Sequence, residues 1–173
     1  MKQTYRNRCC ISGPQGKQLL NIPVLKGNSK QATKEVKIDY DTPWQQHHLK
    51  TLASCYNSSP FYEFFEAELT ELLSRKETFL LDLNLKCHEF VMESIQMFVP
   101  KTRLTSVYEK DYEVAKDYRY LVNAKAQQSF DFEPYTQVFS ERYGFIENLS
   151  VLDLLFAEGG NSLNYLETQS FPW

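Results

Sequence analysis

Long apolar runs are absent from this chain of 173 residues. A membrane-spanning helix needs about 20 consecutive apolar residues, and no stretch of the sequence approaches that length. The opening segment, Met1–Ile11, is polar and lacks the apolar centre of a signal peptide. We therefore expect a cytoplasmic protein without a transmembrane segment.

Patterns that bind metals or form disulfides are also missing. The chain has no C-x-x-C motif, and the two adjacent histidines lack cysteine or carboxylate neighbours at zinc-binding spacing. Two adjacent cysteines cannot easily bridge each other. The sequence therefore predicts no metal site, no cofactor and four reduced thiols, which are Cys9, Cys10, Cys55 and Cys87.

An excess of positive charge is missing too. Nineteen Lys and Arg stand against 22 Asp and Glu, so the net charge is 19 − 22 = −3 with histidine neutral. The two signs are interspersed along the chain, which gives no long-range attraction to a polyanion. We expect no nucleic-acid partner.

Aromatic side chains, in contrast, are plentiful. They make up 14% of the residues, enough to build a substantial hydrophobic core. No internal repeat or low-complexity tract divides the sequence. The length predicts one domain over residues 1–173.

The segment from residue 42 to residue 56 predicts an amphipathic helix. Its apolar side chains recur every four residues from Trp44 to Tyr56, with His48 among them. Thr42 is followed by Pro43 and, three residues on, by Gln45. This pattern predicts a capping box, in which Thr42 caps the helix and Gln45 reaches back to a free backbone N–H.

A second amphipathic helix is predicted directly after the first. Ser59 is expected to cap it, and Pro60 suits the first helical position. Its predicted apolar face consists of Phe61, Phe64, Phe65, Leu69, Leu72 and Leu73.

Short strands are predicted before this helix pair. A hairpin is predicted from about Arg6 to Val24, with its turn at Gly13–Gly16, and Glu35–Asp39 predicts a third strand. Later segments predict a helix from Phe79 to Phe98, a short helix at 118–122 and a helix capped by Ser150. The fold class is therefore α/β (or α+β), with a small sheet and an N-terminal hairpin packed against several amphipathic helices.

Two arginines on the first predicted strand are candidates for ligand binding. Arg6 and Arg8 are two residues apart, so they share one face of a strand while Asn7 faces the other way. Two guanidinium groups on one face suit a phosphate or a carboxylate. On spacing alone, a solvated strand face paired with nearby acids is the commoner explanation for such a pair.

His48 is the candidate for acid–base chemistry. A histidine within an apolar stripe is more often a hydrogen-bonded core residue than a catalyst. The alternative is proton transfer, or recognition of a polar ligand, at the edge of the helix.

A series of motifs, in order along the chain, resembles the WbqC-like family. They are Tyr5-Arg6-Asn7-Arg8-Cys9, Ile22-Pro23-Val24, Trp44…His48…Leu52…Tyr56, Ser59-Pro60-Phe61, Asp117-x-Arg119, Tyr135-x-Gln137-Val138-Phe139, Gly144-Phe145 and the run from Asn148 to Gly159. This resemblance implies a role in the biosynthesis of bacterial surface polysaccharides of the O-antigen type. The activity it suggests is transfer of glycine or another acyl group to a sugar.

The chain departs from the family pattern in two places. Family members usually carry some tens of residues before the Arg-Asn-Arg strand, and we expect this chain to lack that segment. Its loss would expose a sheet edge, which is a template for a homodimer. In addition, Asn123-Ala124-Lys125 stands where the family tends to have a Pro-Lys pair.

Two classes of function remain open. In the enzyme, Arg6, Arg8 and Lys125 would bind a nucleotide sugar or an acyl donor, while His48 would act as a base oriented by Asp117 or Asp153. Asn7, Arg119 and Gln137 complete the ligand-binding candidates. The alternative is a non-catalytic binding or scaffolding module, in which Asp117 and Arg119 form a local ion pair and Gln137 makes a loop hydrogen bond.

Overall fold

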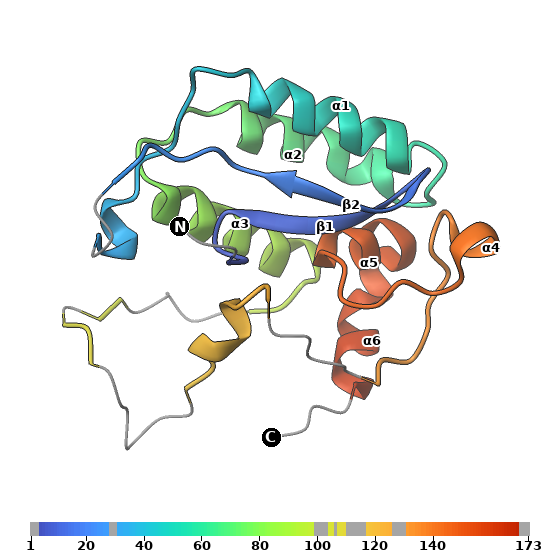
Figure 1. Cartoon of the computed structure of the whole chain (residues 1–173). Coiled ribbons are helices and arrows are strands. Elements are labelled where there is room, and N and C mark those ends of the chain that lie inside the picture. The colour runs from blue at the N-terminus through green and yellow to red at the C-terminus, as the bar shows by residue number, and fades with distance from the viewer. Residues whose placement is uncertain are drawn as a thin grey trace.

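A computed structural model describes residues 4–27, 31–98, 104–105, 107–109, 117–125 and 131–169. Within these residues the elements are, in chain order, β1 (Arg8–Gly13), β2 (Gly16–Asn21), the 3-10 helix η1 (Thr33–Glu35), α1 (Trp44–Tyr56), α2 (Tyr62–Ser74), α3 (Leu80–Ser94), the 3-10 helix η2 (Arg119–Val122), α4 (Ser140–Tyr143), α5 (Val151–Glu158), the 3-10 helix η3 (Gly159–Asn161) and α6 (Ser162–Thr168). Figure 1 shows their arrangement. The mixed architecture that the sequence predicts is confirmed.

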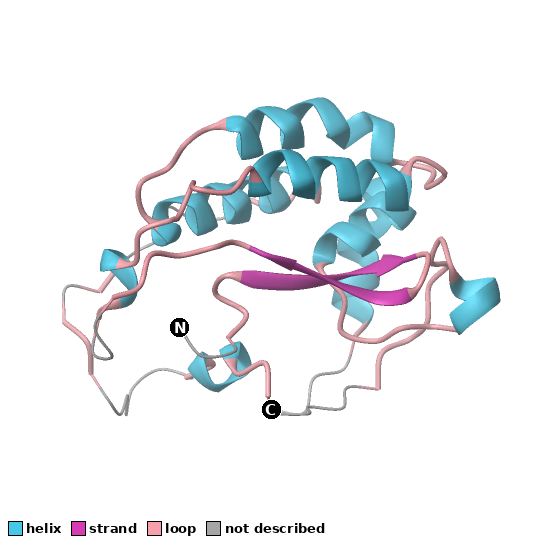
Figure 2. Ribbon diagram, turned by 45° about the horizontal axis from the view of Figure 1, so that its top comes forward, coloured by secondary structure: helices cyan, strands magenta, loops and turns pink. Residues whose placement is uncertain are grey.

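The two strands form the predicted hairpin. They pair in antiparallel fashion, with Cys9 opposite Leu20 and Ile11 opposite Gln18. The turn leads into Gly16, whose φ of 93° is a conformation that glycine adopts without strain. The larger helices gather on one side of the strands (Figure 2), so the hairpin has one face toward them.

Side chains and backbone from distant segments close the outer edge of β1. The backbone N–H of Ser150 donates to the carbonyl of Cys10 at 2.6 Å. The backbone N–H of Ser12 donates to the hydroxyl of Tyr56 at 3.1 Å. This strand edge is therefore bound to both α1 and the start of α5.

The core is centred on Phe156 of α5. Its ring lies 4.9 Å from that of Tyr56, 5.1 Å from that of Tyr62 and 6.4 Å from that of Phe65, measured between centroids. Ile11 of the hairpin joins the same cluster and is completely buried. Rings from α1, α2 and α5 thus meet the hairpin in one core.

The capping box predicted for α1 is wrong. The helix begins at Trp44 without a side-chain cap. Gln45 instead donates its amide to the carbonyls of Leu73 and Arg75, the second at 2.8 Å, and so closes the end of α2. These carbonyls lack partners within their own helix and lie close to α1.

The predicted cap of α2 is also wrong. This helix begins at Tyr62, and the hydroxyl of Ser59 donates to the carbonyl of Phe156 at 2.7 Å. The backbone N–H of Phe61 donates to the same carbonyl at 3.0 Å. The loop before α2 therefore closes the end of α5. On the predicted apolar face, Phe64 proves 68% exposed.

Helix α3 ends earlier than predicted. Its last residue is Ser94, and Gln96 adopts a positive φ of 58°. The N–H of Met97 donates to the carbonyl of Met92 at 2.9 Å, which is the hydrogen bond that closes a helix through a left-handed residue. Phe98 lies beyond this stop and is 90% exposed.

The third predicted strand is present only as isolated bridges. Val24 bridges Ile38, and Lys37 bridges Phe79. The predicted short helix at 118–122 is found as η2, and Ser150 caps α5 as predicted, through a 3.4 Å bond from the N–H of Leu152. No helix among the described residues is long and apolar enough to cross a membrane.

Candidate functional site

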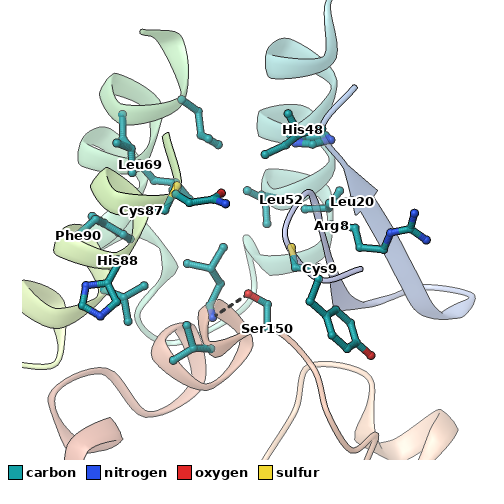
Figure 3. Close-up of a pocket in the computed structure, with 18 of the residues that line it drawn as sticks. Arg8, Cys9, Leu20, His48, Leu52, Leu69, Cys87, His88, Phe90 and Ser150 are labelled. Carbon is teal, nitrogen blue, oxygen red and sulfur yellow. Dashed lines mark hydrogen bonds between the residues drawn. The ribbon is translucent and has the colours of Figure 1, made fainter. Parts of the chain in front are cut away.

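A cavity of about 390 Å³ lies between the hairpin and the helices. Figure 3 shows α1 and the hairpin on one side of it, α2 and α3 on the other, and the start of α5 below. Its walls are mostly apolar. The apolar lining includes Leu20, Ile22, Leu52, Leu69, Leu72, Leu73, Phe90, Val91, Val151 and Leu152.

Arg6 and Arg8 both line this cavity, although not for the predicted reason. The strand begins at Arg8, and Arg6 and Asn7 lie in the turn before it. The side chain of Asn84 on α3 donates to the carbonyl of Arg6 at 2.9 Å and so holds this turn against the cavity. The arginines are brought together by tertiary contacts rather than by a shared strand face.

Arg8 lies at the rim of the cavity. Strand alternation sends Arg8 and Cys9 to opposite faces, and in Figure 3 the guanidinium of Arg8 points away from the helices. Its Nε atom is shielded from solvent and has no hydrogen-bond partner in the described part of the chain. A buried donor without a partner is unfavourable. An anion that accepted a hydrogen bond from the Nε of Arg8 would remove this cost.

His48 contributes to the cavity from α1 and is 7% exposed. Its ring stands edge-on to that of Trp44, with the centroids 5.1 Å apart. Burial lowers the pKa of His48, and a hydrogen bond to the backbone of Asn21 offsets part of this effect. The imidazole is therefore neutral at pH 7, the form that can accept a proton.

Two cysteines and a second histidine also line the cavity, which the sequence reasoning missed. Cys9 and Cys87 project into the cavity from the hairpin and from α3 respectively (Figure 3). Burial raises the pKa of each thiol to about 11, so both are protonated at neutral pH. Their apolar setting was visible in the sequence, but their convergence with His88 was not.

The charges around the cavity are of one sign. Among the described residues that line it, Arg6 and Arg8 are the only Arg or Lys, and none is Asp or Glu. An apolar space with arginines at its margin suits a ligand with an apolar body and an anionic end.

Asp117 and Arg119 lie elsewhere and bind each other. The Nε of Arg119 donates to both carboxylate oxygens of Asp117, at 2.8 and 2.9 Å. This guanidinium lowers the pKa of Asp117 to about 2. The guanidinium also lies over the ring of Tyr108, 5.1 Å from its centroid. Neither residue lines the cavity.

Lys125 and Asn7 lie near the arginines without lining the cavity. The backbone N–H of Tyr5 donates to the carbonyl of Val122 at 2.9 Å, which brings the exposed Lys125 and its segment beside that of Arg6. Asn7 is 5% exposed and donates to the side chain of Asn21 at 3.1 Å. Its amide supports the entry of the chain into the hairpin.

Asp153 and Gln137 belong to a separate buried network. The hydroxyls of Tyr56 and Tyr135 donate to the two oxygens of Asp153, at 2.6 and 2.8 Å. Gln137 exchanges hydrogen bonds with the backbone of Ile146, at 2.8 and 3.0 Å. Their side chains are thus engaged within the protein, which fits a structural role.

Comparison with known proteins gives the chain its family. No curated protein and no solved structure matches it. The model of the WbqC-like protein family matches residues 1–129, which include the hairpin, α1, α2, α3 and the arginines of the cavity. The chain therefore belongs to the WbqC-like protein family.

Proposed function

We propose that the chain binds an acyl donor in the cytoplasmic biosynthesis of a bacterial surface polysaccharide of the O-antigen type. The observation that carries this proposal is the cavity, whose described lining residues combine apolar walls with two arginines and include no acidic residue. Its volume of about 390 Å³ falls within the usual range of ligand pockets, roughly 300–1,000 Å³.

The apolar walls favour one of the two expected donors. A nucleotide sugar is polar along its whole length and would leave the walls unmatched. An acyl chain would cover them, while a phosphate or carboxylate at its end would reach Arg6 and Arg8. The same argument favours an acyl group with a hydrocarbon chain over glycine.

Binding is better supported than catalysis. His48 is neutral and lines the cavity, but Asp117 and Asp153 do not line it and cannot orient this imidazole there. In the second candidate function, acyl transfer, His48 would take the proton of a sugar hydroxyl or amine as that group attacks the acyl carbonyl. The bond between this carbonyl and the oxygen or sulfur of the donor's carrier would then break, and the carrier would leave with the proton returned by His48. The position of His48 at the cavity wall is the observation that favours it.

Calorimetric titration with three probes tests the proposal. Octanoate has a chain and an anionic end, octanamide keeps the chain without the charge, and a nucleoside diphosphate sugar has the anion without the chain. We expect octanoate to bind most tightly. The tightest binding by the nucleotide sugar would contradict the acyl-donor assignment.

Matched variants locate the binding site. Cys9→Phe fills the cavity and should abolish octanoate binding, whereas Cys10→Phe on the opposite face of β1 should not. Arg6→Ala should weaken binding about tenfold or more through loss of a charged hydrogen bond, and the exposed Lys125→Ala should leave it unchanged. If Cys9→Phe and Cys10→Phe bind octanoate equally, the ligand occupies another site.

A further inference from the structure

A second cavity of about 160 Å³ lies on the other side of the start of α5. It shares Ser150 and Val151 with the first cavity. It is built by residues after 131, beyond the part of the chain that the family model matches. Its lining includes four aromatic rings, those of Phe132, Tyr135, Phe145 and Tyr165.

Three of these rings pack edge-to-face on one another along the cavity lining. The ring of Tyr135 is nearly perpendicular to that of Phe145, at 77° with the centroids 5.3 Å apart. It is also nearly perpendicular to that of Tyr165, at 78° and 5.2 Å. The segments before and after α4 supply three of these rings and α6 supplies the fourth, so the tertiary fold assembles them.

Hydrogen bonds hold the two tyrosines in place. The hydroxyl of Tyr135 donates to Asp153 at 2.8 Å, and the hydroxyl of Tyr165 donates to the carbonyl of Glu133 at 2.5 Å. Because both hydroxyls are engaged by the protein, the rings offer a ligand mainly their carbon surface.

Acidic residues lie beside the two tyrosines: Asp153 accepts from the hydroxyl of Tyr135, and the backbone of Glu133 accepts from that of Tyr165. Asp153 adds to the burial that raises the pKa of Tyr135, and Glu133 and Glu158 do the same for Tyr165. Among the described residues that line this cavity, none is Lys, Arg or His. The first cavity, in contrast, has two arginines in its lining.

We propose that this cavity binds a small organic cation, of the quaternary ammonium class. Aromatic faces attract cations through their quadrupole, and nearby carboxylates add to this attraction. A cavity of about 150 Å³ is known to hold a benzene ring, so 160 Å³ has room for a trimethylammonium group. A neutral apolar ligand would gain nothing from the acidic surroundings.

Titration of the wild-type protein with two isosteric alcohols tests this proposal. Choline carries the charge, and the uncharged alcohol with carbon in place of its nitrogen has the same shape. We expect choline to bind about tenfold more tightly. Equal binding would show a cavity that selects only shape, and no binding by either would exclude the site. Both results overturn the proposal.

Variants connect the binding to the rings. Tyr165→Leu should abolish choline binding, while Tyr165→Phe, which keeps the ring, should retain it. Tyr120→Leu removes a tyrosine that is 51% exposed and lies outside the cavity, and it should change nothing. Unchanged choline binding by a folded Tyr165→Leu protein would overturn the proposal. If that variant unfolds, loss of binding in Phe145→Leu takes its place, and retention there would overturn the proposal.

Discussion

Burial shifts the pKa values of His48 and Asp153 in opposite directions. For both side chains the charged form is disfavoured, so the pKa of the histidine falls and that of the carboxyl rises. The folded protein therefore binds a proton less tightly at His48, and more tightly at Asp153, than the unfolded chain does. The two groups give stability opposite pH dependences in separate pH ranges.

For His48 the loss of stability comes on the acid side. Its folded pKa lies below the unfolded value of 6.5, so its contribution is complete above pH 6.5 and declines as the pH falls through that window. We expect His48→Gln to flatten the plot of unfolding free energy against pH there. Denaturant titrations from pH 5 to 8 would measure it.

The exposed His88→Gln variant is the control for this slope. It removes an exposed imidazole and leaves the buried His48 in place. If both variants retain the wild-type slope, then burial of His48 is not the source of the pH dependence.

The stability of the protein is also sensitive to an added methyl group at Gly159. Its φ is 53°, and a Cβ there would lie 2.6 Å from the ring of Phe61. We expect Gly159→Ala to lower the free energy of unfolding by about 1–3 kcal/mol, measured by urea denaturation. Gly160→Ala has nothing within 4 Å of the new Cβ and should cost far less. A similar cost at both positions would contradict this account.

Several helix ends in this protein are closed by neighbouring elements. Gln45 of α1 binds the last carbonyls of α2, and Ser59 binds a carbonyl at the end of α5. The sequence predicts these two side chains in local N-terminal caps of α1 and α2, but the structure uses them at the C-terminal ends of α2 and α5. They also bind each helix to another, so the helices depend on their packing.

Loss of the Gln45 amide should destabilise the protein. Gln45→Ala leaves the carbonyls of Leu73 and Arg75 without this donor, and we expect a cost of about 1 kcal/mol in thermal or urea unfolding. Thr42→Ala should have little effect, whereas a capping box would make Thr42 as important as Gln45. A larger loss of unfolding free energy for Thr42→Ala than for Gln45→Ala would contradict this account and support the capping box.

The sequence was informative where a rule depends on near neighbours. The hairpin, the apolar stripe of α1 and the Ser150 cap of α5 follow from alternation, helical period and local hydrogen bonding. The same local rules failed at Thr42 and Ser59. The amide of Gln45 and the hydroxyl of Ser59 could each bind either a local or a distant backbone group. Only the tertiary packing selects between the two partners.

The candidate site was predictable to a similar degree. Arg6, Arg8 and His48 do line one cavity, whereas Asp117 and Lys125 do not. Cys87 and His88 join them because α3 packs opposite the hairpin, and no periodicity within α3 contains that information. The sequence indicated candidate residues one by one, but which of them converge on one cavity depends on the tertiary fold.

At the scale of the whole molecule, Tyr56 joins three distant segments. Its hydroxyl accepts from the N–H of Ser12 in β1 and donates to Asp153 in α5, while its own backbone ends α1. The ring also packs on Phe156. Hairpin, helix pair and C-terminal helices therefore meet at one phenol.

Removing that hydroxyl should weaken the whole fold. In Tyr56→Phe both Ser12 and Asp153 lose a buried partner, and we expect a loss of about 1–3 kcal/mol. For a chain of this size each kcal/mol lowers the melting temperature by about 2–4 °C. Calorimetry would measure the shift.

Tyr62→Phe is the matched control. Tyr62 is also buried, at 3% exposure, but within the described part of the chain its hydroxyl reaches only Glu66, at 3.4 Å. Its removal should cost clearly less than that of the Tyr56 hydroxyl. Equal losses of unfolding free energy in the two variants would contradict a special contribution of the Tyr56 hydroxyl to stability.

Contacts between residues far apart in the sequence have a consequence for synthesis on the ribosome. Tyr56 and Ser59 each bind a group 97 residues further along the chain. Ribosomes add about 5–20 residues per second, so the helix pair waits roughly 5–20 s for its partners. Hairpins and helices form within microseconds. The nascent protein therefore holds its first elements, with their apolar faces uncovered, for most of its translation, and the core closes only once the last quarter of the chain has emerged.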